Sequence, residues 1–391
     1  MAGIIALGVA YFLSQFYRSF LAVMTPSLRA DLGMTAPEMS NALGIWFIAF
    51  ALMQFPLGGW LDRFGPRWPA ALPLAVAGAG GAILFAVATA PWHVILAMAL
   101  IGIGCSPVLM ASLVIYARRF RPDLFATATA LLIGTASFGN LLAAEPMALA
   151  IDALGWRTCM AVIAAVTLAV AVAIFLSVSD QTAEPSTGDS GSFWSVLGTR
   201  ALWPIFAIMF VAYAAPAGLR GVWIGPYFAD THSFDGLAIG RETFWMAIAL
   251  ALGALAIGPL DRVFGTRKGI VVGACALTAT ATALLALAPD RAPWQATVLF
   301  VLIGLCGMSY VTIMAHGRAF VPAAMTGRGV TVLNFFSISG AGLFQYLTGF
   351  VFTAAQAGGT AVSAYSAVFA SYAVALSLAI AWYLFAEDAK P

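Results

Sequence analysis

The residue with the clearest chemical potential is an arginine inside the first long apolar run. This run, IIALGVAYFLSQFYRSFLAVMTPSL from Ile4 to Leu28, is about as long as a membrane-spanning helix, and Arg18 lies a little past its middle. A charge at that depth costs roughly 2.5–3.5 kcal/mol, so such residues normally face a bundle interior or a wet cavity. Tyr11, Ser14 and Gln15 share its helix face at three- and four-residue spacing. This cationic stripe favours a path for an anion, and the alternative is a structural arginine that snorkels or pairs with a carboxylate.

A second arginine, Arg220, lies in a later apolar run. The two runs contain FYRSFLAVMTP from Phe16 to Pro26 and GLRGVWIGP from Gly218 to Pro226, so each arginine precedes a proline. The intervals are eight and six residues, which puts the two arginines on different helix faces. A guanidinium stays charged when it loses water and offers a fork of donors to a carboxylate or phosphate. We predict that both bind substrate; for Arg220 the alternative is an ordinary arginine or a gate residue at the outer end of its helix.

Further polar and aromatic residues inside apolar runs would complete a cavity of modest polarity. The predicted substrate-binding set adds Tyr11, Gln15, Tyr17, Gln54, Trp223, Tyr310, Asn334 and Ser337 to the two arginines. Asn334, Ser337 and Gln345 recur at helical spacing along one side of a single run. Each of these residues could instead join neighbouring helices through hydrogen bonds. As a set they indicate a small polar or amphipathic substrate.

Glu145 is a carboxylate well inside an apolar run, and Pro146 follows it. A buried glutamate can bind a proton near neutral pH because loss of water disfavours its charged form. Glu145 is therefore a candidate for proton coupling. The alternatives are that it neutralises Arg18 or lies near the outer interface without a special role.

Composition defines the broad class. The chain has 391 residues, of which 62% are hydrophobic and only 9% are charged, and its mean hydropathy is +0.96. Soluble domains carry about 25% charged residues, so this composition indicates a polytopic membrane protein of all-α class. A net charge of +2 gives no case for nucleic acid. The four cysteines, three histidines and fourteen methionines show no metal-ligand spacing, so we expect no metal and no cofactor.

Charged and Pro/Gly-rich breaks divide the chain into twelve apolar spans. We place six in residues 1–178, near 4–28, 38–60, 69–89, 92–116, 124–149 and 157–178. A linker at 179–200 contains SDQTAEPSTGDSGS and a possible short interfacial helix. Six more spans in residues 201–391 lie near 201–227, 240–260, 269–288, 294–315, 328–354 and 362–386. The first helix is expected to stay in the mature protein, because no cleavable signal pattern precedes it.

The basic residues of the loops predict the orientation. One side of the membrane would hold twelve, namely Arg63, Arg67, Arg118, Arg119, Arg121, Arg200, Arg262, Arg267, Lys268, Arg318, Arg328 and Lys390. The other side would hold four, namely Arg29, Arg157, Arg241 and Arg291. This asymmetry predicts that both termini are cytoplasmic.

A repeated basic motif indicates that the two halves are duplicates. The predicted loop from Gly58 to Arg67 reads GGWLDRFGPR, and its counterpart from Gly258 to Lys268 reads GPLDRVFGTRK. An aspartate at a helix end can pair with arginines or cap a facing helix, so such a cluster can hold one conformation and release another. The predicted conformational latch comprises Gly58, Asp62, Arg63, Gly65 and Arg67 in the first half and Asp261, Arg262 and Gly265 in the second.

Along its whole length the chain resembles the major facilitator superfamily, whose signature G-x-x-x-D-R-x-G-[RK]-[RK] is matched from Gly58 to Arg67 with Pro66 as the one departure. The Gly155–Arg157 segment, GWR, also resembles the family pattern. The resemblance implies two six-helix bundles around a central cavity that opens alternately to each side. It further implies a transporter that uses no ATP, works as a single chain and is not an enzyme. Its location would be the inner (plasma) membrane.

The arginines of the first and seventh spans resemble those of the organophosphate:phosphate and related organic-anion branch, which bind the anionic group of the substrate. We therefore predict a symporter or antiporter for a small organic anion of carboxylate or phosphate type, with protons or a counter-anion as coupled species. The alternative is a proton-coupled drug or metabolite exporter of the same superfamily. That branch carries G-x-x-x-G-P-x-x-G-G in its fifth helix, whereas Asn140 follows Gly139 here.

Overall fold

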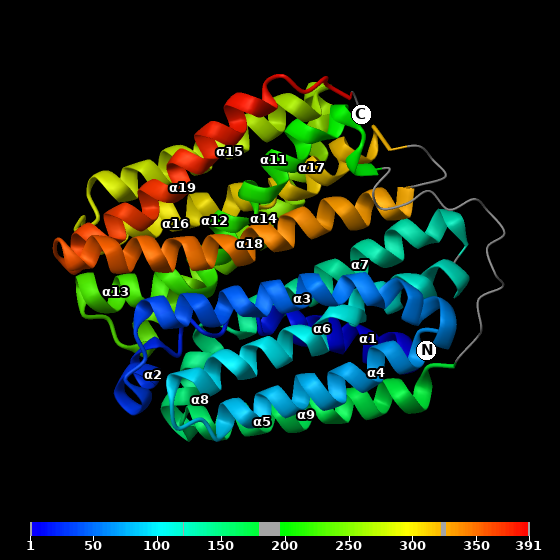
Figure 1. Cartoon of the computed structure of the whole chain (residues 1–391), viewed down its shortest axis with the longest axis horizontal. Helices are drawn as coiled ribbons and strands as arrows, with labels where there is room; N and C mark the ends of the chain where they lie inside the picture. The colour runs from blue at the N-terminus through cyan, green and yellow to red at the C-terminus, as the bar shows by residue number, and fades with distance from the viewer. Residues whose placement is uncertain (1, 120, 180–195, 322–325, 390–391) are drawn as a thin grey trace. The chain divides into compact units, whose positions relative to one another are not determined.

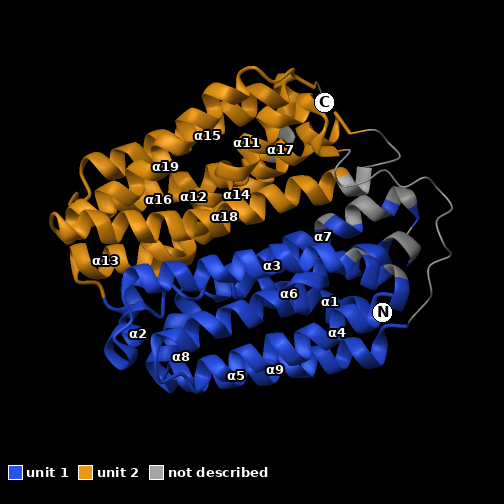
Figure 2. Ribbon diagram, viewed as in Figure 1, with its two compact units in different colours: residues 1–187, 235–240 blue, residues 188–234, 241–391 orange. Residues whose placement is uncertain are grey.

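The structure, a computed structural model, describes residues 2–119, 121–179, 196–321 and 326–389. Within these ranges the regular structure is helical, and no strand occurs. The chain divides into two compact units, Met1–Thr187 with Asp235–Gly240 and Gly188–Phe234 with Arg241–Pro391 (Figure 2). Most of the predicted linker, residues 180–195, lies outside the described residues.

Unit 1 is built from helices that run along one another (Figure 1). In chain order these are α1 (Ala2–Phe16), α2 (Thr25–Leu32), α3 (Ala36–Phe64), α4 (Arg67–Pro73), the π-helix η1 (Leu74–Ala79), α5 (Gly80–Ala86), α6 (Pro91–Arg119), α7 (Pro122–Leu142), α8 (Glu145–Leu154) and α9 (Trp156–Ser177).

Unit 2 repeats this pattern with more interruptions. Its helices are the 3-10 turn η2 (Arg200–Leu202), α11 (Trp203–Ala212), α12 (Ala214–Gly218), the π-helix η3 (Leu219–Trp223), α13 (Ile224–His232), α14 (Gly236–Phe264), α15 (Arg267–Leu287), α16 (Pro293–Gly307), α17 (Ser309–Arg318), α18 (Thr326–Ala357) and α19 (Ala361–Tyr383). The first residues of α14, up to Gly240, group with unit 1.

Ten stretches of the described residues are long and apolar enough to cross a membrane. They coincide with ten of the twelve predicted spans. The other two predicted spans, 4–28 and 124–149, each contain two shorter helices, so neither is one continuous helix, and the count of twelve spanning helices stays a prediction. The division separates α1 from α2 and α7 from α8.

Three predicted spans are interrupted shortly before a proline, although α3 and α6 continue through Pro56 and Pro107. A proline inside a helix lacks an N–H, and its ring clashes with the carbonyl four residues earlier. Accordingly α7 ends four residues before Pro146, and α11 ends four residues before Pro216. Before Pro26, residues 17–24 form a series of turns in place of α-helix. The tenth span also breaks, at Met308 between α16 and α17, where no proline lies nearby in the sequence.

The two predicted motif loops are mostly helical, which corrects their boundaries. Helix α3 continues to Phe64, and α14 continues to Phe264. Each helix stops only where a glycine takes a positive φ, 70° at Gly65 and 65° at Gly265. Glycine adopts this left-handed region without the steric cost that a Cβ brings. The loop proper is therefore two residues long in each unit, and the matching glycines support the duplication.

Both units bring two helix backbones together at a glycine. A Cβ on Gly139 of α7 would lie 2.3 Å from the carbonyl oxygen of Phe12 in α1. In unit 2, a Cβ on Gly340 of α18 would lie 1.8 Å from the carbonyl oxygen of Phe210 in α11. The first and fifth predicted spans thus pack as the seventh and eleventh do, and this contact limits how the arginine-bearing spans can move within their units.

Candidate functional site

Arg18 lies in an irregular stretch of backbone between α1 and α2. Its N–H donates to the carbonyl of Gln15 at 3.3 Å, and that of Ser19 donates to Phe16 at 3.0 Å, so both bonds span three residues where an α-helix spans four. The Arg18 residue is only 6% exposed. Short departures from α geometry in membrane helices are frequent at functional sites. The prediction that Arg18 faces the interior is consistent with this burial.

Two aromatic rings of α3 hold the Arg18 guanidinium. Its central carbon lies 5.0 Å from the ring centroid of Trp46 and 5.0 Å from that of Phe50. The two rings are one helical turn apart and stack on each other, with centroids 5.1 Å apart. Aromatic faces attract a cation through their quadrupole, by about 0.5–2 kcal/mol, without cancelling its charge. These contacts therefore hold the guanidinium against the α3 face.

The position of Trp46 is set by a close helix contact. A Cβ on Gly102 of α6 would lie 2.4 Å from the Trp46 carbonyl oxygen, so α6 presses on the backbone of α3 at this residue. One turn further along α6, the Ser106 hydroxyl donates to the carbonyl of Phe50 at 2.9 Å. The close packing of α6 against α3 therefore holds the two rings that contact Arg18 in place.

Two polar atoms of the same α3 face are buried and make no hydrogen bond within the described residues. They are the indole Nε1 of Trp46 and the amide Oε1 of Gln54, at positions two helical turns apart. A buried donor without an acceptor costs about 1–3 kcal/mol, so it calls for a physical explanation such as a ligand. Sequence reasoning identified Gln54 and missed Trp46, although the spacing of Trp46, Phe50 and Gln54 places all three on one face of α3.

The other predicted residues of the first span are buried or partly buried, and one of them fastens the backbone beside Arg18. Tyr11 is buried on α1 and Gln15 is partly buried. Tyr17 is fully buried, and its hydroxyl lies 2.9 Å from that of Thr167 in α9, so it fastens the irregular stretch to the rest of unit 1. The Ser19 hydroxyl likewise donates to Asn140 of α7 at 2.8 Å. These two bonds hold the backbone on either side of Arg18.

Glu145 is the first residue of α8. It follows the interruption at Ala143 and Ala144, and its side chain is partly buried. A carboxylate in the first turn of a helix is favoured by the helix dipole. The structure thus places Glu145 at a second irregular backbone position of unit 1.

Arg220 also lies where a helix departs from α geometry. It belongs to the π-helix η3 between α12 and α13 and is 2% exposed. Next to it, a Cβ on Gly218 would lie 2.1 Å from the Gln345 amide nitrogen and 2.4 Å from the Tyr372 hydroxyl oxygen. Only glycine leaves room there for these two polar side chains, which therefore lie against the end of α12, two residues before Arg220. Tyr372, which lies in α19, was not among the predicted residues.

The other predicted residues of unit 2 lie on three elements. Trp223 of η3 is fully buried, and its indole N–H donates to Thr348 of α18 at 3.1 Å. Ser337 of α18 is buried, whereas Asn334 is partly buried. Tyr310 of α17 packs on Tyr213, with ring centroids 5.2 Å apart, beside two interruptions of the helices. Within unit 2 these residues are therefore spread over several helices, and two of them, Trp223 and Tyr310, lie at or beside interruptions.

In unit 1 the predicted latch residues are held by an aromatic contact. The Arg67 guanidinium lies 4.0 Å from the ring centroid of Phe175 in α9, and the Trp68 ring meets the same phenylalanine edge-on at 4.9 Å. The Arg63 guanidinium lies 5.3 Å from the Phe64 ring and is exposed. The side chain of Asp62 lies outside the described residues, and nothing is described of the surroundings of Gly58, so the pairing expected for Asp62 stays a prediction.

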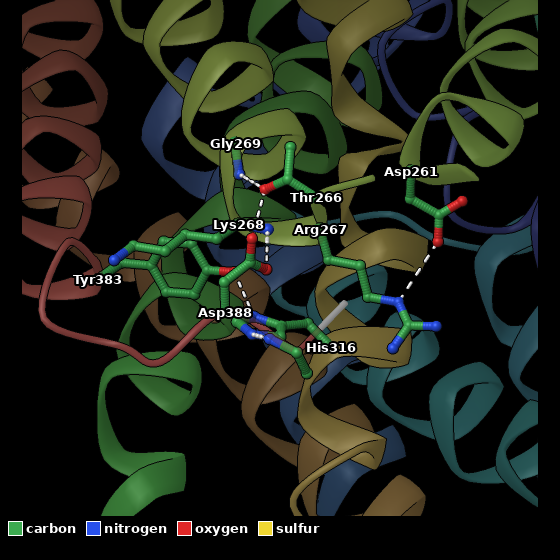
Figure 3. A network of polar contacts seen from close by, with 9 residues as sticks. Asp261, Thr266, Arg267, Lys268, Gly269, His316, Tyr383 and Asp388 are labelled. Atoms are coloured by element: carbon green, nitrogen blue, oxygen red, sulfur yellow. Dashed lines mark hydrogen bonds and ion pairs between the residues drawn. The ribbon is translucent and has the colours of Figure 1, made fainter. Parts of the chain in front are cut away.

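In unit 2 the corresponding turn is held by polar contacts (Figure 3). Arg267 donates from Nε to the carboxylate of Asp261 at 3.3 Å. Asp388, beyond the end of α19, accepts from the Thr266 hydroxyl at 2.5 Å and from the Lys268 backbone N–H at 3.0 Å. The side chain of Arg262, the other predicted member, lies outside the described residues. Asp388 was missed because 120 residues separate it from Lys268.

The segment after α19 that carries Asp388, the C-terminal tail, also contacts a histidine. His316 of α17 is fully buried, its Nδ1 contacts the Tyr383 hydroxyl, and its Nε2 lies 2.9 Å from the Glu387 carbonyl oxygen. Burial raises the pKa of the nearby Asp388 carboxyl, but the hydrogen bonds from Thr266 and Lys268 outweigh it, so this pKa lies below its ordinary value. Asp388 is therefore ionised at neutral pH, and the tail forms a charged clasp on the α14–α15 turn.

At the opposite end of each unit, an aspartate after the first span contacts the start of the last helix. In unit 1, Asp31 accepts from the Trp156 indole N–H at 2.9 Å and pairs with Arg157, which also donates to the Ala88 carbonyl at 3.2 Å. The GWR segment, Gly155–Arg157, thus joins the start of α9 to α2. In unit 2, Asp230 accepts from the hydroxyl of Tyr365.

Comparisons with known proteins identify the family and match the helical fold. The family model described as Major Facilitator Superfamily matches residues 7–240. The chain is 23% identical over 267 residues to an uncharacterised transporter, YybO, of Bacillus subtilis (strain 168), covering 63% of this chain and 61% of the relative. A stretch of 50 residues is 40% identical to a probable L-galactonate transporter of Escherichia coli (strain K12), covering 13% of this chain and 11% of the relative. The alignments thus span less than two thirds of the length of either curated relative.

Two solved structures share the fold. One is a bacterial homologue of the human lysosomal transporter Spinster in an inward-facing, unoccupied conformation, with a TM-score of 0.81, 18% identity, and coverage of 98% of this chain and 96% of that chain. The other is the nucleoside transporter NupG, with a TM-score of 0.74, 19% identity, and coverage of 99% and 100%. At such identities the likeness concerns the fold alone. Because the family model matches more than half of the sequence, the chain belongs to the major facilitator superfamily.

Proposed function

We propose that this protein is a secondary transporter that moves a small organic anion across the inner membrane by alternating access. Arg18 and Arg220, one from each unit, would bind the anionic group of the substrate. The observation that carries the proposal is that both arginines are buried in spans that depart from α geometry at the arginine itself. Family membership fits this activity.

The energetic cost of the two arginines supports a functional role. Each guanidinium is removed from water within an apolar span, and such intramembrane charges usually mark a substrate or ion pathway. The irregular backbone adds a further cost, because it leaves carbonyl and N–H groups outside the α-helical pattern. A structural arginine would not need this second feature. Irregular backbone beside an ion site is, by contrast, typical of secondary transporters.

The surroundings of Arg18 favour a hydroxylated carboxylate. The guanidinium and the Trp46 indole N–H are donors suited to carboxylate oxygens, and the Gln54 carbonyl oxygen is an acceptor suited to a hydroxyl group. A sugar acid carries both kinds of group. The 50-residue match to a probable L-galactonate transporter makes aldonates the first class to test.

The motif turns would control the change of conformation. Asp62 and Arg63 in unit 1, and Asp261 and Arg262 in unit 2, stand where the second and third spans of each unit join. The Asp261–Arg267 pair and the Arg67–Phe175 contact support this role, because each joins the turn to a neighbouring element through a contact that can break and re-form. Glu145, at an interruption of its span, is the candidate for proton coupling.

Thermal stabilisation of the purified protein tests the binding site. A ligand of the folded state raises the apparent unfolding temperature by mass action. Aldonates, dicarboxylates, phosphate esters and cationic amphiphiles would be compared on wild type, Arg18→Gln and Trp46→Phe. Arg119→Gln, which removes an exposed arginine at the end of α6, is the matched control for net charge.

We expect an anion to stabilise wild type and the control, and to stabilise Arg18→Gln far less. Trp46→Phe keeps the aromatic face and removes the indole N–H, so it should weaken carboxylates by about tenfold to a hundredfold, the range for a hydrogen bond to a charged group. Equal stabilisation of all four proteins by cationic or neutral amphiphiles would reject the anion site and favour the exporter.

Transport itself is tested in proteoliposomes. A radiolabelled aldonate should exchange across the membrane in the presence of wild type and not of Arg18→Gln, at equal reconstituted amounts. With Glu145→Gln, uptake that depends on a pH gradient should be lost while exchange between equal pH values is kept. Uptake by Glu145→Gln with an unchanged pH dependence would reject proton coupling through this residue.

A further inference from the structure

An apolar groove lies on unit 2 between α11, α18 and α19. It encloses about 620 Å³ and is lined by apolar side chains, among them Phe206, Phe210, Phe336 and Phe344. None of its lining residues belongs to the predicted substrate site. The groove opens on the surface of the unit, because the lining residues Trp203 and Leu378 are 53% and 67% exposed. Its volume is in the range of pockets that hold small molecules.

The floor of the groove is rigid. Phe206 of α11 and Phe336 of α18 stack face to face, with ring centroids 4.5 Å apart, and Phe210 meets Phe344 at 6.1 Å. The two helices also touch at the Phe210 carbonyl and Gly340. Side chains that are already paired cannot turn to fill the space, so the groove is a preformed feature of the unit.

The position of the groove on three candidate membrane-spanning helices restricts its occupant. All three helices lie in stretches long and apolar enough to cross a membrane. An apolar groove on such helices is suited to hydrocarbon, and its lining offers almost no hydrogen-bonding groups. The occupant must therefore present a flexible hydrocarbon surface, as the acyl chain of a bilayer lipid does.

One end of the groove carries residue types that are typical of the lipid headgroup region of a membrane. Trp203 opens α11 and Trp382 stands one residue before the end of α19, and tryptophan concentrates at the membrane–water interface. The Trp203 indole N–H donates to the Leu197 carbonyl at 3.1 Å, which closes the intervening turn across this end. Arg200 lies exposed in that turn, between two lining residues. A guanidinium at this level complements the phosphate of an anionic lipid.

We propose that the groove binds one acyl chain of an anionic phospholipid and that Arg200 binds the headgroup phosphate. The lipid stays bound to unit 2 and is not the transported substrate. Because α11 continues through α12 into η3, occupancy of the groove supports the span that carries Arg220.

Native mass spectrometry of the delipidated protein tests this proposal. Phosphatidylglycerol and phosphatidylcholine with identical chains would be titrated onto wild type, Arg200→Gln and two groove-filling variants, Ala207→Trp in α11 and Ala375→Phe in α19. Ala165→Trp, on the exposed face of α9 in unit 1, is the matched control for added bulk. Thermal unfolding without lipid would confirm that each variant is folded.

We expect one tight equivalent of phosphatidylglycerol on wild type and Ala165→Trp, and its loss in the folded groove-filling variants. Arg200→Gln should weaken phosphatidylglycerol about fivefold, the factor for one basic residue at an anionic headgroup, and weaken phosphatidylcholine less, because its choline cation offsets the phosphate charge. Wild-type binding in both groove-filling variants would overturn the proposal. Displacement of phosphatidylglycerol by inorganic phosphate would also overturn it, because a free anion would then be the ligand.

Discussion

The turn between the second and third spans has the same backbone in both units and is held by different forces. In unit 1 the basic residue after the glycine, Arg67, packs on the ring of Phe175. In unit 2 its counterpart Arg267 pairs with Asp261, and the adjacent backbone binds Asp388 of the C-terminal tail. The two glycines with φ near 70° keep the geometry equal.

This difference shows which parts of a duplicated unit are free to change. The backbone turn depends on a glycine, so its geometry has few alternatives. The contacts that restrain it only have to join the turn to the last helix of the unit, and an aromatic face or a carboxylate can each do so. The consequence is that the two turns respond differently to salt and pH: the contacts in unit 2 involve the carboxylates of Asp261 and Asp388, while that in unit 1 is between a cation and a ring.

The largest effect is expected where the two units are alike. Gly139→Ala and Gly340→Ala each place a methyl group within 2.3 Å or less of a backbone carbonyl oxygen, which the helices can relieve only by separating. Each should destabilise its unit by about 3 kcal/mol, the upper range for overpacking. Gly134→Ala and Gly273→Ala, where a Cβ meets nothing within 4 Å, are the controls.

Unfolding temperatures measured in detergent check this prediction. The controls should leave the protein unchanged or raise the temperature slightly, because alanine favours helix over glycine by about 1 kcal/mol. If Gly340→Ala unfolded like Gly273→Ala, the close contact of α11 with α18 would be wrong, and with it the equivalence of the two units.

The clasp of unit 2 gives the next largest effect. Asp388→Asn removes the charge that accepts from Thr266 and Lys268, and should cost about 1 kcal/mol after allowance for its exposure. The loss should shrink in 1 M salt, roughly the concentration at which the screening length falls to about 3 Å. Glu387→Gln is the matched control, because Glu387 contributes only its backbone carbonyl to the clasp. Equal destabilisation by both changes would mean that the Asp388 carboxylate is not part of the restraint.

The aromatic contact of unit 1 gives a smaller effect of different character. Arg67→Gln or Phe175→Leu should each remove the interaction between the cation and the ring, which is worth about 0.5–1 kcal/mol at such a site. A double-mutant cycle on unfolding temperatures should show coupling between the two that changes little with salt. Additive effects would show that the two side chains act independently.

The smallest effect concerns pH at the opposite end of unit 1. Hydrogen bonds from Trp156 and Arg157 hold the pKa of Asp31 below its ordinary value. Its contribution to stability is therefore complete above the unfolded pKa, about 4, and is lost as the pH falls through the lower folded pKa. Asp31→Asn should lower the unfolding temperature at pH 7 and flatten its decline below pH 4. If Asp31→Asn kept the wild-type decline of the unfolding temperature below pH 4, other carboxylates would account for the acid sensitivity.

The duplicated helical fold could be read from the sequence because its signals are local. Apolar runs of about twenty residues, the D-R and glycine motif and the two arginines all lie within short windows. Pro146 and Pro216 are local signals for the interruptions before them, but proline alone does not predict a break, because α3 and α6 continue through Pro56 and Pro107. The break at Met308 has no such signal.

The contacts that complete the candidate site are not local. Trp46 supports Arg18 only because Gly102 lets α6 press against α3, and the sequence does not state which helices touch. Asp388 meets Lys268 across 120 residues of chain. Such pairs follow from the packing of whole helices, which single-sequence patterns do not specify.

The central claim is that Arg18 and Arg220 bind the same anion, and isothermal titration of an aldonate that stabilises the protein tests it most directly. Wild type, Arg18→Gln, Arg220→Gln and the double variant would be compared, with Arg318→Gln, an exposed arginine of unit 2, as control. We predict that each single change weakens binding by about tenfold or more and that the double variant is weaker than wild type by less than the product of the two factors. Wild-type affinity in Arg18→Gln would contradict the account.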